Sequence, residues 1–418
     1  MNEAAAATKP PTETRARVSG VSGLVGPPVS SQSAAPDSPP ARKLLRTARG
    51  KVKLSSPVKL LEESTVECST QTVCSSPSSS PLKGKGKARK TKPACGVEPL
   101  QDGEEVTDTT GRRWRLEKLL SQSSTELLYQ VCQTVSRSNS KESSHILKLG
   151  AKDGRIFTEQ NFLQRAAKPA TVEKWIKQNK MDFLGIPSCV GFGLHAESYR
   201  FLIFPNMGRS LSSIMEDQDQ DQDQLLSERT VLQLACRILD VLQYLHSNEY
   251  VHADINAENI YIKPGDKSQV YLGGFCHSFR FCPGGTHVEY RESSRTPHEG
   301  AVEFISLDAH KGAAPSRRSD LQSLGFCMLR WHTGALPWTP LLSDPQQVAN
   351  HKQRLMEDVP ALLSLCFRNN KVPRVFEWYL REVMTLQYCE QPNYSELKSG
   401  LTDELLKLGA TPEQPISF

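Results

Sequence analysis

The sequence predicts an α+β protein in which a small β-rich lobe precedes a larger helical lobe, both after a disordered basic tail. Residues 1–100 are rich in Ser, Pro, Ala, Gly and Lys and have little hydrophobic periodicity, a composition that buries too little apolar surface to fold. From Thr110 the apolar residues alternate as in strands, and from Asp320 onward most of the chain shows helical spacing. We therefore assign residues 1–109 to the tail, 110–410 to the folded domain and 411–418 to a C-terminal tail.

The composition indicates a reducing compartment and no membrane segment. The 418 residues carry a net charge of +5, but residues 1–100 hold 16 basic and 7 acidic residues, which leaves 35 basic and 39 acidic residues for the rest. The eleven cysteines are scattered without a CxxC pair, so neither a zinc site nor a disulfide framework is indicated. The N-terminus lacks an apolar core of signal-peptide length, and no run of 18 apolar residues occurs.

Two basic clusters in the tail suggest how its charge is used. One spans residues 42–53 and the other is KGKGKARKTK at 83–92. They are typical of a nuclear-import signal, and the alternatives are a solvated charged segment or contact with nucleic-acid phosphates. No aromatic residue accompanies them, so base stacking is not indicated and nucleic acid is not an expected main partner. Ser56-Pro57 and Ser80-Pro81 resemble targets of proline-directed kinases.

The small lobe is expected to contain paired strands and one long helix. A polar run, DQDQDQDQ at 217–224, is expected to form a surface loop, and a hinge lies near 204–210. In the helical lobe, residues 227–250 carry apolar residues at helical spacing with Ser227 as the expected N-cap. The small-lobe strands are predicted at 114–120, 126–135, 145–149, 187–195 and 199–204, and its helix at 155–168.

The sequence HADINAEN at 252–259 fits the pattern H-x-D-x-x-x-x-N of a kinase catalytic loop. Lys148, in a predicted strand, precedes Glu159 of the predicted helix by eleven residues. Further strings are FTEQNFLQRAAKP, EFISLDAHKGAAPSRRSDLQSLG and ALPW. With these motifs, residues 110–410 resemble a protein kinase and, among kinases, the vaccinia-related kinase family of the casein kinase 1 group. The match is strongest to a pseudokinase of that family.

The resemblance implies roles for four retained residues. Lys148 and Glu159 match the pair that orients the nucleotide phosphates, although the same ion pair also ties the helix to the small lobe. Asp254 matches the catalytic base, with a loop-ordering role as the alternative, and Asn259 matches a metal ligand. Position 253 is Ala in place of the usual Arg, and position 256 is Asn where active relatives carry Lys.

The glycine-rich loop of the family is replaced by SQSSTELLY. Four of its residues stand where glycine is expected, and each Cβ obstructs the approach of backbone N–H groups to phosphate. A carboxylate about 5 Å from one phosphate charge repels it by roughly 3 kcal/mol at an effective dielectric near 20. Glu126 therefore opposes ATP unless it rotates away or is neutralised by Lys148. The four substituted positions are Ser121, Ser123, Ser124 and Glu126.

Three other positions complete the predicted site. Gly274 stands where the family has the Asp that binds the metal bridging the phosphates, so we expect no metal ligand there. Asp320 matches the helical Asp that braces the catalytic loop through backbone hydrogen bonds. Phe204 lies near the position that gates the adenine pocket, with a simple core aromatic as the alternative.

We therefore expect a catalytically inactive, cofactor-free scaffold in the nucleus, with the cytoplasm as a second location, which enters the nucleus through an import receptor and acts by binding signalling proteins. The resemblance implies a dual-specificity phosphatase directed at MAP kinases as partner, whose activity the scaffold promotes. The alternative is a weakly active or unconventional Ser/Thr kinase that binds ATP and Mg²⁺ through Asp254, Asn259 and Lys148, with Glu126 as a displaced metal ligand. A third hypothesis is a chromatin or nucleic-acid tether through the basic tail.

Overall fold

A computed structural model describes residues 98–134, 145–217 and 225–418. The basic clusters, the Ser-Pro sites and residues 1–97 of the predicted disordered tail lie outside this part of the chain, as do residues 218–224 of the predicted loop. The first residue of that loop, Asp217, is the last residue of α3 (Leu211–Asp217). No helix among the described residues is long and apolar enough to cross a membrane.

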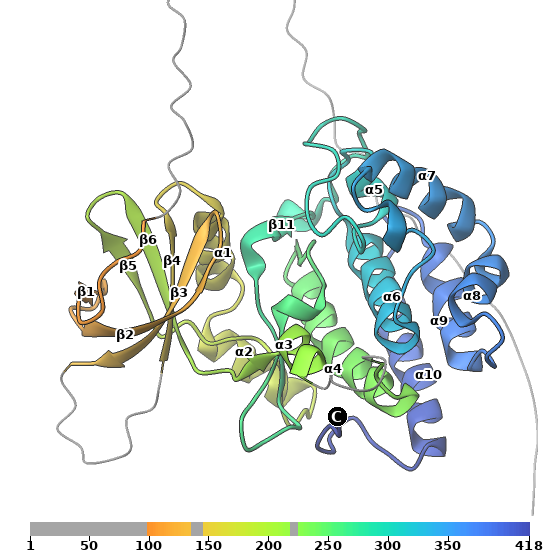
Figure 1. Ribbon diagram of the computed structural model, residues 1–418, viewed down its shortest axis with the longest axis horizontal. Helices are drawn as coiled ribbons and strands as arrows, with labels where there is room; N and C mark the ends of the chain where they lie inside the picture. Colours follow the sequence, from red (N-terminus) through yellow and green to blue (C-terminus); the bar gives the residue numbers. More distant parts are fainter. Residues whose placement is uncertain (1–97, 135–144, 218–224) are drawn as a thin grey trace, which may run out of the picture. The chain divides into compact units, whose positions relative to one another are not determined.

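The small lobe is built on a six-stranded antiparallel sheet with the strand order β1-β2-β3-β4-β6-β5 (Figure 1). The predicted alternation is confirmed in most of β3, where Leu127, Tyr129 and Val131 are buried and Leu128 and Gln130 between them are half-buried. These side chains pack with Trp114 and Leu147 into one apolar core. The strands are β1 (Glu105–Thr107), β2 (Arg113–Gln122), β3 (Glu126–Gln133), β4 (His145–Ala151), β5 (Gly191–His195) and β6 (Tyr199–Pro205).

The folded region begins before the predicted boundary at residue 110. Strand β1 pairs with β2, and Val106, opposite Trp114, is 1% exposed. Upstream of β1, the backbone N–H of Leu100 donates to the hydroxyl of Tyr129 at 2.8 Å. The sequence did not reveal this strand because it is only three residues long and has a single buried side chain.

Two helices follow β4 where one was predicted. Helix α1 (Arg155–Arg165) ends before Pro169, which begins α2 (Pro169–Gln178). The residue before a proline disfavours helical backbone, and proline itself fits the first turn of a helix, so the boundary follows from the sequence after all. Phe162 of α1 stacks on Phe275 with ring centroids 4.3 Å apart, which ties α1 to the segment that follows β10 (Val270–Leu272).

The helical lobe is centred on α4 (Glu228–Ser247) and α6 (Arg317–Thr333), which contact each other (Figure 1). The predicted N-cap is confirmed, because the side chain of Ser227 accepts a hydrogen bond from the N–H of Thr230. The other helices are α3 (Leu211–Asp217), α5 (Leu307–His310), α7 (Pro345–Met356), α8 (Val359–Phe367), α9 (Arg374–Met384) and α10 (Tyr394–Lys407).

Short strands frame the segment between α4 and α6. Strand β9 (Ile260–Ile262) pairs with β10 and with β7 (Arg209–Ser210), and β8 (Tyr250–Val251) pairs with β11 (Phe279–Arg280). Strands β8 and β9 therefore hold both ends of the loop 252–259, and β10 and β11 hold both ends of the segment around Gly274.

The C-terminal residues 411–418 are part of the packed domain and not a separate tail. Ile416 is 3% exposed. The Thr230 hydroxyl donates to the carbonyl of Ser417 at 2.9 Å, and the Gln233 amide donates to the carbonyl of Thr411 at 3.1 Å. The packing of this segment could not be predicted, because two apolar residues at the end of a chain give no periodicity.

Candidate functional site

The loop 252–259 is held in place by Asp320 of α6. The backbone N–H groups of His252 and Ala253 donate to its two carboxylate oxygens, each at 2.8 Å. Asp320 is fully buried and also bonds Nε2 of His246 on α4 at 2.8 Å. Its predicted bracing role is confirmed.

Within this loop, Asp254 is bonded to its own neighbours. The Asn259 amide donates to the Asp254 backbone carbonyl at 2.8 Å and to Oδ2 at 3.1 Å. The Asn256 amide donates to Oδ1 at 3.2 Å. Asn256 thus helps to order the loop. The two residues that match a catalytic base and a metal ligand are bonded to each other.

Gly274 has left-handed backbone, with φ 73° and ψ 44°, and begins the 3-10 turn Phe275–His277. A Cβ at this position would lie 2.0 Å from Oδ1 of Asn259 and 2.4 Å from its Cγ. An aspartate could enter only if the Asn259 side chain left its bonds to Asp254. The Asn259 amide therefore fills the space in which a metal-binding carboxylate would stand.

Lys148 on β4 lies at the centre of a buried polar group, which we call the Lys148 cluster: Lys148, Glu126, Glu159 and Cys276. Its ammonium is 2.8 Å from Glu159 Oε2 on α1, which is the predicted ion pair. It is also 2.8 Å from Glu126 Oε2 at the start of β3. The Cys276 thiol lies 3.1 Å from the ammonium and donates to Glu126 Oε1 at 2.8 Å.

The electrostatics of the Lys148 cluster favour one protonation state. Burial opposes the ammonium charge, but the carboxylates of Glu159 and Glu126 outweigh it and hold the pKa of Lys148 well above its usual value. Burial likewise opposes ionisation of Glu159, yet Lys148 and the hydrogen bonds to Glu159 lower its pKa. Burial and the two carboxylates raise the pKa of the Cys276 thiol, which stays protonated. The cluster thus holds one cation, two anions and a neutral thiol.

The turn between β2 and β3 directs Glu126 into the cluster. Oγ of Ser123 accepts hydrogen bonds from the N–H groups of Thr125 and Glu126 at 3.3 and 3.0 Å. The Ser123 N–H donates to the Glu126 carbonyl at 2.8 Å. Ser121 pairs with Leu128 in the sheet, and Ser124 is exposed. Among the predicted substitutions, Ser123 shapes the turn and Glu126 fills the site below it.

Comparisons with known proteins agree with this architecture. A family model described as the protein kinase domain matches residues 143–397. Serine/threonine-protein kinase VRK3 of Mus musculus is 45% identical over 333 residues, which cover 79% of this chain and 73% of the mouse protein. The chain belongs to the vaccinia-related kinase family. The resemblance predicted from the motifs is therefore confirmed.

Two further members of the vaccinia-related kinase family support the assignment. Serine/threonine-protein kinase VRK2 of Homo sapiens is 38% identical over 315 residues, or 74% of this chain and 61% of that protein. A solved structure titled "Structure of vaccinia related kinase 3" is 45% identical, covers 77% of this chain and 95% of its own, and has a TM-score of 0.70. The predicted bilobal kinase fold is confirmed.

The residues of this family member do not fit ATP bound with a metal ion. The lysine expected to orient phosphates already has two carboxylate partners. The position of the metal-binding aspartate is glycine, and the Asn259 amide occupies the adjacent space. Glu126, Glu159 and Cys276 do bring three potential metal-ligand atoms within 4.8 Å of one another. However, the Lys148 ammonium bonds all three, and a protonated thiol is a poor ligand.

Phe204 belongs to the predicted site residues, whereas Cys276 does not. Phe204 is 5% exposed, lies opposite Ile146 in the sheet and packs into the large apolar core, as expected of a core aromatic. The participation of Cys276 was not predicted. The sequence places it two residues after Gly274, but only the fold brings its thiol beside Glu126.

Proposed function

We propose that this vaccinia-related kinase family member is a catalytically inactive kinase-fold protein that acts by binding other proteins. One observation carries the proposal: the Glu126 carboxylate lies 2.8 Å from the Lys148 ammonium. In this contact the Lys148 ammonium is paired with a carboxylate, whereas in an active kinase the corresponding ammonium binds the phosphates of ATP.

A triphosphate would meet an unfavourable charge balance at this position. The Lys148 cluster already carries one more negative than positive charge, since its thiol is neutral. The Lys148 ammonium offsets only one of the two carboxylate charges, so each phosphate charge about 5 Å from the remaining one is repelled by roughly 3 kcal/mol at an effective dielectric near 20. Nucleotide binding would require Glu126 to leave Lys148.

The metal side of the site supports the same proposal. Metal ions bridge and neutralise the phosphates during phosphoryl transfer, and they need carboxylate or amide oxygens that are free to bind them. Here Gly274 supplies no carboxylate, and a carboxylate side chain at this position would have to displace Asn259, whose amide nitrogen donates two hydrogen bonds to Asp254. These residues preserve the shape of the loop.

The scaffold role follows from what is retained. Asp320 still fixes the catalytic loop to α4 and α6, so the helical lobe keeps a rigid surface. We propose that this surface works in the nucleus, reached through the basic tail, and promotes a dual-specificity phosphatase that acts on MAP kinases. The partner class rests on the family resemblance.

The alternative is a weak Ser/Thr kinase. It is supported by the retention of Asp254, Asn259 and Lys148 and by the names of the relatives, which call them serine/threonine-protein kinases. Both proposals can be separated by one set of binding measurements.

The decisive experiment is a thermal-shift titration of the full chain with ATP, with and without Mg²⁺ or Mn²⁺. We expect no shift for the natural sequence at millimolar ATP. Glu126→Gly frees one face of Lys148, so we expect ATP to bind at least tenfold more tightly to this variant. Glu117→Gly, which removes a carboxylate of β2 outside the cluster, should behave like the natural sequence.

Adding Gly274→Asp to Glu126→Gly tests the metal side. We expect little further gain from Mg²⁺, because the new Cβ would meet Asn259. A metal-dependent shift in the natural sequence, together with phosphorylation of a protein substrate that Asp254→Asn abolishes, would establish the kinase alternative. For the scaffold role, the purified chain should raise the turnover of a MAP-kinase-directed dual-specificity phosphatase, and an unchanged turnover would exclude this partner.

A further inference from the structure

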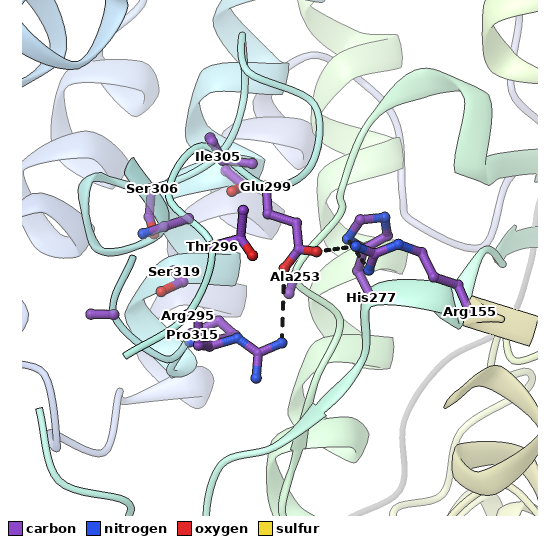
Figure 2. Close-up of a pocket in the computed structure, with 13 residues that line it drawn as sticks. Arg155, Ala253, His277, Arg295, Thr296, Glu299, Ile305, Ser306, Pro315 and Ser319 are labelled. Carbon is purple, nitrogen blue, oxygen red and sulfur yellow. Dashed lines mark hydrogen bonds and ion pairs between the residues drawn. The ribbon is translucent and has the colours of Figure 1, made fainter. Parts of the chain in front are cut away.

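A second charged cluster lies outside the Lys148 cluster, between α1 and the segment that precedes α5. The Arg155 guanidinium on α1 forms an ion pair with Glu299, and Arg295 Nη2 lies 3.9 Å from the other oxygen of the same carboxylate. Arg155 also lies 3.3 Å from Nδ1 of His277. Figure 2 shows the two arginines reaching Glu299 from two sides. Two arginines thus share one carboxylate, and His277 contacts one of the two arginines.

Thr296 lines the cavity formed by these residues. The cavity has a volume of about 40 Å³, room for about three or four waters at roughly 10–15 Å³ each. Figure 2 shows Thr296 beside Glu299 in this cavity. Ala253 also lines it, at the position where the family pattern has an arginine, and its short side chain leaves the space open.

Thr296 precedes Pro297, and the chain contains three Thr-Pro pairs. The other two are poorly placed for modification. The Thr339 hydroxyl donates to Glu303 and accepts a hydrogen bond from the Leu336 N–H. Thr411 is half-buried, and its carbonyl is bonded to Gln233. Thr296, by contrast, is exposed in an irregular segment.

We propose that Thr296 is a phosphorylation site for a proline-directed Ser/Thr kinase, and that its phosphate binds Arg155 and Arg295 in place of Glu299. The modifying kinase transfers the γ-phosphoryl group of its ATP to Oγ of Thr296. The new P–O bond forms as the bond to ADP breaks, and the hydroxyl proton passes to the base of that kinase. The proposal does not depend on whether this chain itself binds ATP.

The exchange follows from charge and geometry. A phosphate brings nearly two negative charges and three acceptor oxygens, against one charge and two oxygens for Glu299. Backbone bonds from Arg295 to Gly312 at 2.9 Å and from His298 to Ala309 at 3.0 Å hold the segment on both sides of Thr296. The phosphate is therefore kept at the cavity, and the repelled Glu299 carboxylate turns to solvent, to which it is already 28% exposed.

The first test is mass spectrometry after treatment of the full chain with a purified mitogen-activated protein kinase, ATP and Mg²⁺. We expect phosphate on Thr296 and not on Thr339 or Thr411, none in Thr296→Ala, and at least a tenfold slower reaction in Pro297→Ala. The Asp254→Asn variant should give the same result, which assigns the phosphate to the added kinase. A synthetic peptide of residues 290–302 shows whether the kinase accepts the sequence. Phosphate on the peptide but not on the chain, or on neither, overturns the proposal.

The second test is the rate at which a broad-specificity phosphatase removes the phosphate from Thr296. We expect removal to be at least fivefold faster in Arg155→Gln, which lacks one of the two arginines that bind the phosphate, than in the natural sequence. Arg381→Gln, which breaks an exposed ion pair with Glu377 on α9, is the matched control and should show no change. Equal rates in both variants would show that the cavity does not hold the phosphate.

Discussion

Glu126 stands where a glycine-rich loop leaves bare backbone, and its side chain reaches the ammonium of Lys148. One residue thereby changes the environment of three others, since Glu159 and Cys276 bond the same ammonium. Lys148 becomes a structural cation: without it, two carboxylates and a thiol would share a buried space. This differs from the role expected in an active family member, where the lysine also serves the nucleotide.

Lys148→Met should therefore destabilise the fold. Removing one partner of a buried ion pair costs about 3–5 kcal/mol, and we expect a value near the lower end because Glu126 is 24% exposed. The measurement is urea unfolding followed by circular dichroism. Lys118→Met, at an exposed position of β2, should change the free energy of unfolding by less than about 0.5 kcal/mol. Similar values for the two variants would contradict the structural role.

At the scale of elements, the β2–β3 hairpin is shaped by Ser123 and not by glycine. Its hydroxyl accepts from two backbone N–H groups in the turn, which fixes where β3 and Glu126 begin. Strand β2 also shifts register twice against β3, between Leu116 and Lys118 and between Leu119 and Ser121. The element is thus a stable turn with its own hydrogen bonds, whereas a glycine-rich loop leaves N–H groups free for phosphate.

Ser123→Gly should loosen this turn. The variant loses the hydroxyl acceptor and gains backbone freedom, which together cost about 1 kcal/mol. Amide hydrogen exchange across residues 119–129 should become faster, with the largest change at Thr125 and Glu126. Ser124→Gly changes the neighbouring exposed residue and gives only the glycine effect. If both variants exchange alike, the Ser123 hydroxyl does not hold the turn.

On the scale of the whole molecule, Asp320 joins the parts that remain intact. It bonds α4 through His246 and the loop 252–259 through two backbone N–H groups. His246 in turn bonds the hydroxyl of Tyr394 on α10. The changes that we propose oppose nucleotide binding lie around Lys148 and Gly274, whereas this network is complete. Such a distribution agrees with the proposed scaffold.

Asp320→Ala should lower the free energy of unfolding by more than the loss of an exposed charged side chain does. It leaves the N–H groups of His252 and Ala253 and the His246 ring without their buried acceptor, at about 1–3 kcal/mol for each. We expect a loss of roughly 4 kcal/mol or more in the free energy of unfolding, measured by urea titration. Asp344→Ala removes an exposed N-cap of α7 and should cost about 1 kcal/mol. A cost for Asp320→Ala no larger than this would show that the loop is braced by other contacts.

The fold was predictable where a pattern repeats over many residues. The alternation in β3 and the N-cap at Ser227 are seen as expected. Strand β1 and the packing of Ile416 were missed, because each depends on a few residues whose partners are distant in the chain, whereas the start of α2 is marked locally by Pro169. Trp114 covers Val106, for example, and the Thr230 hydroxyl bonds the residue after Ile416.

The sequence by itself determined which chemical groups this family member has and lacks: glycine at position 274, glutamate at 126 and a retained Lys148–Glu159 pair. Side-chain identity and spacing are local properties that can be read along the chain. Only the tertiary structure decided where the Glu126 carboxylate goes, because its partners Lys148 and Cys276 lie 22 and 150 residues away. The direction of a flexible side chain is set by the charges that folding brings near it, and those come from distant segments.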